Sequence, residues 1–268
     1  MNTLASGDLA LICEAALEAG ALARRFKARG LVTTYKAGGS PVTDADMAVD
    51  DLLKTRLLAA RPDYGWLSEE TVDSPARLPQ RRVFVVDPID GTRAYVADKP
   101  WWVISIAVVE DGVSTAGVVF APDLEETYAA TVGAGATLNG QPICASGTEQ
   151  LEGCGMIGDK GFFAHKSWPT PWPTMRIESR NATAYRFCLV ASGAFDGAVV
   201  LAPKADWDVA AGDLIAREAG AHVSDHKGRN YAYNRPHPWQ ASLVCAAPNL
   251  APLILARTRS IDLPSTSS

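Results

Sequence analysis

The sequence predicts an α+β fold, and two features of the chain carry this prediction. In the first half, two segments with helical spacing of apolar residues precede several β-branched stretches separated by turn signals. In the second half, strand-like and helical stretches alternate, which is typical of α/β organisation. The 268 residues, 47% of them hydrophobic, suffice for one large domain or for two that share an interface.

Two helices are expected first, at residues 7–29 and from residue 44 onward. The first has basic residues near its C-terminal end, where the helix dipole favours cations, and Gly30 follows it. A short strand over residues 31–36 and a glycine-rich connection come next. Thr43 has the side chain of an N-cap residue for the second helix, which ends near Arg61.

The remaining first half reads as strands. A short apolar piece at residues 64–67 runs into acidic residues, and a β-branched strand over residues 83–86 ends abruptly at Asp87. Further strand-like stretches lie at residues 102–109, 117–121 and 127–130, and a glycine-rich hairpin at 133–140.

The second half begins near Pro142 and alternates. Three helices are expected at residues 183–192, 209–219 and 250–258, and three strands at 198–201, 221–224 and 242–246. Residues 165–175, rich in tryptophan and proline, predict an exposed ordered loop, with Trp168 to Pro173 as an interface or a lid. The expected division is residues 1–141, residues 142–262, and a disordered serine-rich tail at 263–268.

Composition excludes several classes of partner. The net charge of −5 includes no basic run, which disfavours long nucleic acid. No stretch approaches the roughly 18 apolar residues of a membrane span, so a soluble protein with no membrane partner is expected. The five cysteines have no metal-binding spacing, and free thiols in a reducing cytoplasm are the simplest interpretation.

Carboxylates stand where apolar segments end. Asp87 and Asp90 follow a buried strand and would repel each other without a cation between them, and Mg²⁺ prefers the carboxylate and carbonyl oxygens that this turn supplies. Asp46 and Asp208 each begin a helix, where an ordinary capping role is equally consistent with the pattern. Glu69, taken alone, reads as a solvated charge.

Four motifs together resemble the inositol monophosphatase superfamily of metal-dependent, lithium-sensitive phosphatases. They occur in the order of that family and extend over most of the chain. They are SPVTDAD at residues 40–46, WLSEE at 66–70, DPIDGT at 87–92 and DWDVAAG at 206–212. The first half carries the first three motifs, and the second half carries the last.

The resemblance implies a layered αβαβα sandwich of the inositol monophosphatase and fructose-1,6-bisphosphatase type, often homodimeric, with the active site between the halves. It implies two or three Mg²⁺ ions, held by five residues: Glu69, Asp87, the Ile89 carbonyl, Asp90 and Asp208. Catalytic roles fall to Asp46, Thr92 and Glu69. Contacts to a small phosphorylated metabolite fall to Gly91, Thr92, Thr183, Arg186 and Asp208.

The chemistry fits these residue types, because phosphoryl transfer depends on positioning and charge neutralisation. The expected function is therefore hydrolysis of a small phosphate ester by metal-activated water. A non-catalytic protein that binds metal or phosphate and a glycosidase with paired carboxylates are the alternatives from other classes. The four histidines show no metal spacing and are expected to be surface or packing residues.

The substrate stays open between three esters. Inositol-preferring relatives commonly present a glutamate on the strand before the last motif, whereas this chain has Val199, Val200 and Leu201 there. Arg186 and Lys204 could attract the second phosphate of a 3'(2'),5'-bisphosphate nucleotide, or be solvated surface charges. The SPVT sequence is more similar to that of bacterial nucleotidases and histidinol-phosphate phosphatases than to that of animal inositol monophosphatases. Four tryptophans are candidates for stacking on a base: Trp101, Trp102, Trp168 and Trp172.

Overall fold

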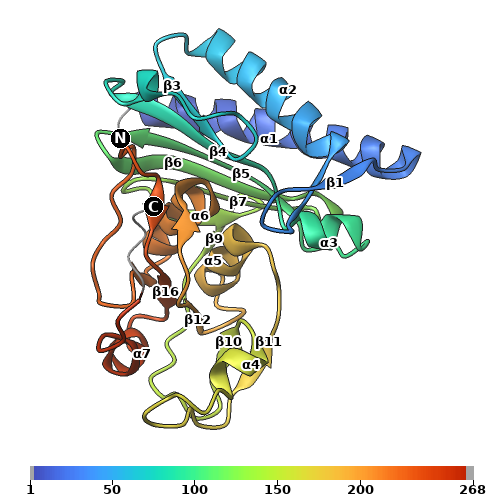
Figure 1. Ribbon diagram of the computed structural model, residues 1–268. Coiled ribbons are helices and arrows are strands. Elements are labelled where there is room, and N and C mark those ends of the chain that lie inside the picture. The colour runs from blue at the N-terminus through green and yellow to red at the C-terminus, as the bar shows by residue number, and fades with distance from the viewer. Residues whose placement is uncertain (1–2, 264–268) are drawn as a thin grey trace.

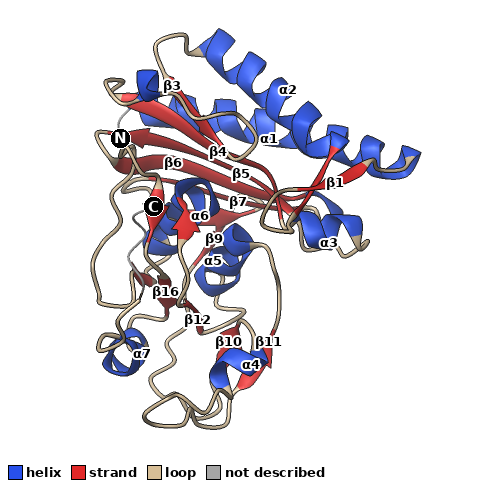
Figure 2. Ribbon diagram, viewed as in Figure 1, coloured by secondary structure: helices blue, strands red, loops and turns tan. Residues whose placement is uncertain are grey.

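The computed structural model describes residues 3–263, which form five alternating layers of helix and sheet (Figures 1 and 2). Helices α1 (Thr3–Arg29) and α2 (Asp44–Ala60) form the outer layer. A seven-stranded sheet, helices α5 (Thr183–Ala191) and α6 (Asp206–Glu218), a five-stranded sheet and helix α7 (Ala251–Thr258) follow. The predicted α+β class and its layered form are therefore confirmed.

The seven-stranded sheet is antiparallel except at one edge, where β3 runs parallel to β4. Its strands, in spatial order, are β3 (Gly65–Ser68), β4 (Arg82–Asp90), β5 (Val103–Glu110), β6 (Val113–Ala121), β7 (Glu126–Thr131), β8 (Ala136–Leu138) and β9 (Gln141–Ile143).

The central strand β4 is apolar on both faces because helices cover both. Phe84 and Val86 pack against the core formed with α1 and α2, whereas Val83 and Val85 pack against the core formed with α5 and α6. Side chains alternate along a strand, so a continuous apolar run is what a doubly covered strand requires. The strand continues beyond its predicted end and includes Asp87 to Asp90, all buried.

The five-stranded sheet has the order β11-β10-β12-β16-β14 and lies between the α5–α6 layer and α7. Its strands are β10 (Gly155–Ile157), β11 (Arg176–Glu178), β12 (Gly197–Val200), β14 (His222–Ser224) and β16 (Leu243–Ala246). The short helix α4 (Lys160–Phe163) packs with α7 on its outer face. Because one apolar cluster joins both sheets through α5 and α6, the division near residue 142 stays a prediction.

Helix α6 approaches its neighbours closely. A Cβ added to Gly212 would lie 2.7 Å from the Cβ of Phe187 in α5, and one added to Gly117 in β6 would lie 3.1 Å from the carbonyl oxygen of Ala211. Contacts under 3.0 Å are not found for real side chains, and 3.1 Å is tight. The small residues that follow Asp208 therefore let α6 sit against both layers.

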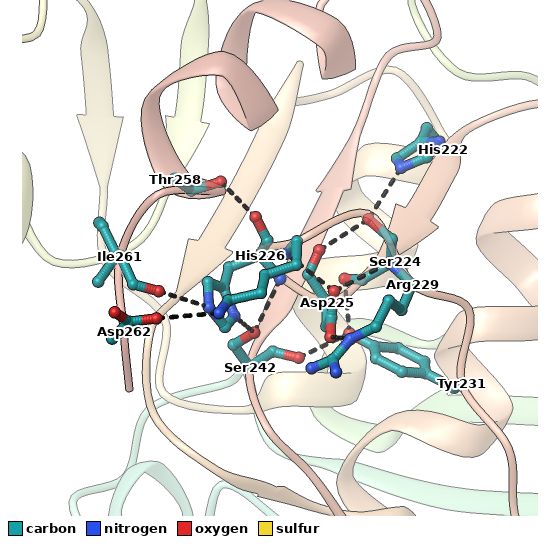
Figure 3. A network of polar contacts seen from close by, with 11 residues as sticks. His222, Ser224, Asp225, His226, Arg229, Tyr231, Ser242, Thr258, Ile261 and Asp262 are labelled. Atoms are coloured by element: carbon teal, nitrogen blue, oxygen red, sulfur yellow. Dashed lines mark hydrogen bonds and ion pairs between the residues drawn. The ribbon is translucent and has the colours of Figure 1, made fainter. Parts of the chain in front are cut away.

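A buried polar network ties the end of the described chain to the five-stranded sheet (Figure 3). The hydroxyl of Thr258 donates to the carbonyl of His226 over 2.9 Å, and the backbone N–H of His226 donates to Ser242 Oγ over 2.8 Å. The Nε2 of His226 lies 3.0 Å from the carbonyl oxygen of Ile261 and therefore carries the ring proton. His226 is thus a packing histidine.

The structure corrects two expectations about aromatic residues. Residues 165–175 form a loop, but Trp168 is 9% exposed and packs edge-on against Phe162 and Trp172. The loop is therefore anchored by its aromatic side chains rather than exposed as a whole. Trp102 is fully buried beside Tyr95, so it cannot stack on a ligand.

Other expectations concern the chain ends and the cysteines. The predicted disorder of the tail falls on residues 264–268, apart from residue 263, and so lies outside the described residues. All five cysteines are unpaired. Across residues 3–263, no helix has the combined length and apolar character that a membrane crossing demands.

Candidate active site

Asp87 and Asp90 are placed at the irregular end of β4. Asp87 pairs with Ser105 and Asp90 with Val103 on β5, so the β4 backbone bulges between the two acids. Oδ1 of Asp87 accepts a 3.1 Å hydrogen bond from the N–H of Ile89. A regular strand would alternate side chains between faces; the bulge changes this register and lets both acids face one point.

Asp208 joins these two acids from the first turn of α6. Ligand atoms of the three carboxylates lie within 4.8 Å of one another, a spacing at which they can share an ion. Oδ2 of Asp208 also accepts a 3.2 Å hydrogen bond from the N–H of Ala205, so the residue caps its helix as well. The nearest cation, Lys204 on strand β13 (Lys204–Ala205), has its Nζ 3.9 Å from Asp208.

The electrostatics of this cluster favour a bound cation. Burial, with the charges of Glu69 and its neighbouring aspartates, raises the pKa of Asp87 well above its ordinary value. Burial and the Asp208 charge raise the pKa of Asp90 to about 7, although two backbone N–H groups and Lys204 oppose the change. Burial also raises the pKa of Asp208. Such carboxylates are poorly compensated by the protein alone, and hard oxygen donors suit Mg²⁺.

Asp90 also caps α5 across the layers. Its Oδ1 accepts the N–H of Thr183 over 3.0 Å, and its Oδ2 accepts the N–H of Ala184 over 2.6 Å. The N-cap residue of α5, Ala182, has no side chain that can do this. The carboxylate of β4 therefore supplies the missing cap, and the helix terminus favours its charge.

Glu69 follows the end of β3 and lies outside the group of three clustered carboxylates. Its Oε1 is 2.7 Å from Lys36 Nζ, and the same amine is 2.8 Å from Oε1 of Glu70. Burial raises the pKa of Glu70 to about 7 despite this ion pair. Glu69 is therefore a paired, partly covered group rather than a freely solvated charge.

Lys36 belongs to a small hairpin. Strands β1 (Thr33–Tyr35) and β2 (Pro41–Thr43) pair antiparallel, and Lys36 lies in the connection between them. Its contacts with Glu69 and Glu70 join the hairpin to the end of β3.

Asp46 and Thr92 contact each other beyond the end of β4. Oδ2 of Asp46 accepts the N–H and the hydroxyl of Thr43 over 2.7 and 2.6 Å, which completes a cap at the start of α2. The hydroxyl oxygen of Thr92 lies 3.2 Å from Asp46 Oδ1 and 3.0 Å from the carbonyl oxygen of Ile89. Asp46 is thus both a helix cap and a partner of Thr92.

Gly91 connects the last residue of β4, Asp90, to Thr92 at the start of the next helix. Its φ of +92° lies in the left-handed region, and it precedes helix α3 (Thr92–Val96). An added Cβ would lie 3.0 Å from the Cβ of Ala182. Both the backbone conformation and the tight space therefore favour glycine.

The predicted substrate contacts occupy different environments. Thr183 is buried, and its N–H is engaged by Asp90. Arg186, one turn further along α5, is half-buried, and its Nε donates to the carbonyl of Arg180 over 2.5 Å. The structure thus brings Asp87, Asp90 and Asp208 together, joins Asp46 to Thr92, and leaves the contacts of Thr183 and Arg186 with substrate as predictions.

Sequence reasoning missed Lys36 and Glu70 as parts of the site. Glu70 stands beside Glu69 in the second motif, and this adjacency of two acids was the available signal. Lys36 gives no comparable signal, because its partners are 33 and 34 residues away.

The layered fold and its buried carboxylate cluster are those of a metal-dependent phosphatase. The chain belongs to the inositol monophosphatase family, whose sequence pattern matches residues 7–263. It is 34% identical over 233 residues to an inositol-1-monophosphatase of Mesorhizobium japonicum, with 83% of this chain and 87% of the relative covered.

Two further comparisons agree with this family. A histidinol-phosphatase of Mycobacterium tuberculosis is 35% identical over 237 residues, with 82% of this chain and 88% of the relative covered. The crystal structure of the extragenic suppressor protein SuhB from Bartonella henselae matches with a TM-score of 0.83 at 25% identity, covering 95% of this chain and 99% of that one.

Proposed function

We propose that this protein is a Mg²⁺-dependent phosphomonoesterase that hydrolyses a small phosphate ester. The observation that carries the proposal is the convergence of Asp87, Asp90 and Asp208 within 4.8 Å. With Glu69 and the carbonyl of Ile89, these residues would hold two or three ions. Their oxygen donors are the kind that Mg²⁺ prefers. Burial and the charges of neighbouring acids raise the pKa of Asp87 and Asp90, and a bound cation would favour their ionised forms.

The bound ions would supply a water of lowered pKa and would neutralise charge on the phosphate. The protein's own part is to hold that water in line. Both donors of Thr43 occupy Oδ2 of Asp46, which leaves Oδ1 to accept the proton of the Thr92 hydroxyl. The lone pairs of Thr92 Oγ1 then face away from Asp46 and can accept a hydrogen bond from the water.

Phosphate positioning would fall to the turn after β4. The backbone N–H groups of Gly91 and Thr92 lie where the chain enters α3, and glycine permits close approach of a ligand there. Thr183, Arg186 and Asp208 would border the leaving group on the side of α5 and α6.

The substrate is proposed from three classes: an inositol monophosphate, a 3'(2'),5'-bisphosphate nucleotide and histidinol phosphate. Lys204 and Arg186 support a second phosphate, since the amine of Lys204 is 3.9 Å from Asp208 and Arg186 lies within electrostatic reach of Asp90. The apolar residues Val199, Val200 and Leu201 replace the glutamate of inositol-preferring relatives, which disfavours inositol.

The histidinol ester is the second candidate, and a relative supports it. The histidinol-phosphatase of Mycobacterium tuberculosis is 35% identical to this chain over 237 residues.

The decisive experiment measures phosphate released from the three esters with Mg²⁺, with chelator and with added Li⁺. Hydrolysis of one ester that requires Mg²⁺ and falls with Li⁺ supports the proposal. Retained Mg²⁺ binding without release from any ester would favour the non-catalytic alternative. Turnover of a glycoside that survives the chelator would favour the glycosidase.

Assembly and location are further parts of the proposal. Family resemblance supports a homodimer, and sedimentation velocity tests it through the mass of the particle in solution. Five unpaired cysteines support a reducing cytoplasm as the site of action. Fractionation of cells that produce the full chain tests the location.

A further inference from the structure

Helix α2 presents two buried carboxylates one turn apart, Asp46 and Asp50. Residues four apart lie on the same face of a helix, so both side chains point toward the ends of the neighbouring strands β3 and β4. Asp46 contacts Thr92 after β4. Asp50, 5% exposed, has no part in the mechanism above and requires its own explanation.

Both carboxylate oxygens of Asp50 are engaged by the segment that follows β3. Ser68 donates its hydroxyl to Oδ1, and Thr71 donates its hydroxyl to Oδ2 over 2.5 Å. The indole N–H of Trp66 in turn donates to Thr71 Oγ1 over 3.2 Å. A carboxylate accepts from both hydroxyls, whereas an asparagine could accept from one and would have to donate to the other, so a carboxylate is the better match.

The two hydroxyl donors flank Glu69 and Glu70. Asp50 therefore holds both ends of a four-residue segment, Ser68 to Thr71, whose two central residues carry the acids. A third contact lies between these ends, where the N–H of Glu69 donates to the carbonyl of Val86 over 3.3 Å. The backbone beneath Glu69 is thus fixed from α2 and from β4.

We propose that Asp50 is a positioning residue that sets Glu69 for metal binding. This inference rests on the proposed function, in which Glu69 holds an ion. Groups that orient metal ligands commonly account for about 10- to 100-fold of metal affinity, because a free ligand must be ordered when the ion binds. Loss of Asp50 leaves the two hydroxyls without their acceptor and frees the segment.

The test is isothermal titration of Mg²⁺ into metal-free protein, with Mg²⁺ alone as the probe. Asp50→Ala is expected to weaken binding of an ion by about 10-fold or more, and Asp50→Asn by less. Thr71→Val removes one hydroxyl at nearly constant volume and is expected to weaken binding in the same direction. If Asp50→Ala does not fold, Thr71→Val alone tests the proposal.

Asp8→Ala is the matched control. Asp8 is likewise buried and bonded through both oxygens, to Arg61 over 2.8 Å and to Tyr64 over 2.9 Å, but it lies on α1. This variant is expected to lower the melting temperature and to bind Mg²⁺ as the wild type does. A merely structural role for Asp50 predicts the same behaviour for Asp50→Ala.

The outcomes separate the two proposals. If the wild type binds Mg²⁺ and both Asp50→Ala and Thr71→Val bind it equally well, the positioning role is wrong and the proposed function stands. If the wild type binds no Mg²⁺, the proposed function is wrong and the role of Asp50 falls with it.

Discussion

The backbone N–H of Thr183 donates a 3.0 Å hydrogen bond to Oδ1 of Asp90. Asp90 therefore has two roles: it caps α5, and it lies in the carboxylate cluster with Asp87 and Asp208. The connection runs between the layers, from the end of β4 to the start of α5. Changes at Asp90 are expected to affect both the chemistry and the docking of this helix.

Asp90→Asn is predicted to abolish turnover while the protein still folds. Loss of one anionic ligand is expected to cost about 4 kcal/mol of transition-state stabilisation, roughly a thousandfold in rate. The amide nitrogen would face a backbone N–H of α5, which lowers the unfolding free energy by about 1–2 kcal/mol. Phosphate release and thermal unfolding measure the two effects. Asp111→Asn, on an exposed turn, should leave both unchanged, and full activity in Asp90→Asn would contradict the proposed site.

Thr92→Val is predicted to lower kcat by about a hundredfold and to leave KM nearly unchanged. The substitution keeps the shape but removes the hydroxyl between Asp46 and the Ile89 carbonyl. Thr92→Ser retains the hydroxyl and should recover most of the rate. Steady-state kinetics at saturating Mg²⁺ make the comparison, and equal rates for valine and serine would exclude a role for the hydroxyl.

Gly91→Ala is predicted to destabilise the protein more than the replacement by alanine of another glycine in the left-handed region, Gly220. A left-handed alanine costs about 1–2 kcal/mol, and at Gly91 the new Cβ also meets Ala182 at 3.0 Å. Gly220 has φ of +84° with open space around it, so Gly220→Ala measures the backbone cost alone. Denaturant unfolding gives both values. Equal losses would mean that Ala182 moves aside freely.

Stabilisation by Mg²⁺ is predicted to increase with pH. The pKa of Asp90 rises from its ordinary value of 3.8 to about 7 in the folded protein, so folding favours the protonated form. Without metal, this contribution to stability is present at low pH and is lost as the pH rises through about 7. Mg²⁺ needs the ionised form, so the metal should raise the melting temperature more at about pH 8 than at about pH 6.

Thermal unfolding with Mg²⁺ or with chelator checks this pH dependence. In Asp90→Asn the titration of this group is absent, so the rise in melting temperature with Mg²⁺ should differ less between the two pH values. A Mg²⁺ effect that is larger at the lower pH would contradict the assignment.

The sequence predicted the regular elements well where local pattern determines them. Helix α5 begins at Thr183 as expected, and the helices of the outer layer cover the expected residues. Helix α6 begins at Asp206, three residues before its predicted start. Its first turn holds two aspartates and a tryptophan, which are poor signals of a helix interior but occupy a helix start.

What failed depends on contacts between distant residues. Trp168 lies among prolines, which indicate a loop, yet aromatic partners from α4 and from Trp172 bury it. The motifs include Asp90 and Asp208, which the structure brings beside Asp87. No local pattern predicts that Lys36 contacts Glu69 or that Asp50 accepts from Ser68. Such pairings exist only once the layers have packed.

The close packing of α6 has a consequence for recognising inactive relatives. In DWDVAAG, Asp208 faces the acidic cluster, whereas Gly212 lets α6 pack closely against Phe187 because it has no side chain. The motif therefore meets two requirements, one for the chemistry at Asp208 and one for packing at Gly212. A descendant that abandoned hydrolysis could replace Asp208 by a neutral residue that still accepts the N–H of Ala205, but it would still need Gly212 to fold. An inactive relative would therefore differ from this motif at the position of Asp208 and keep the glycine at the position of Gly212.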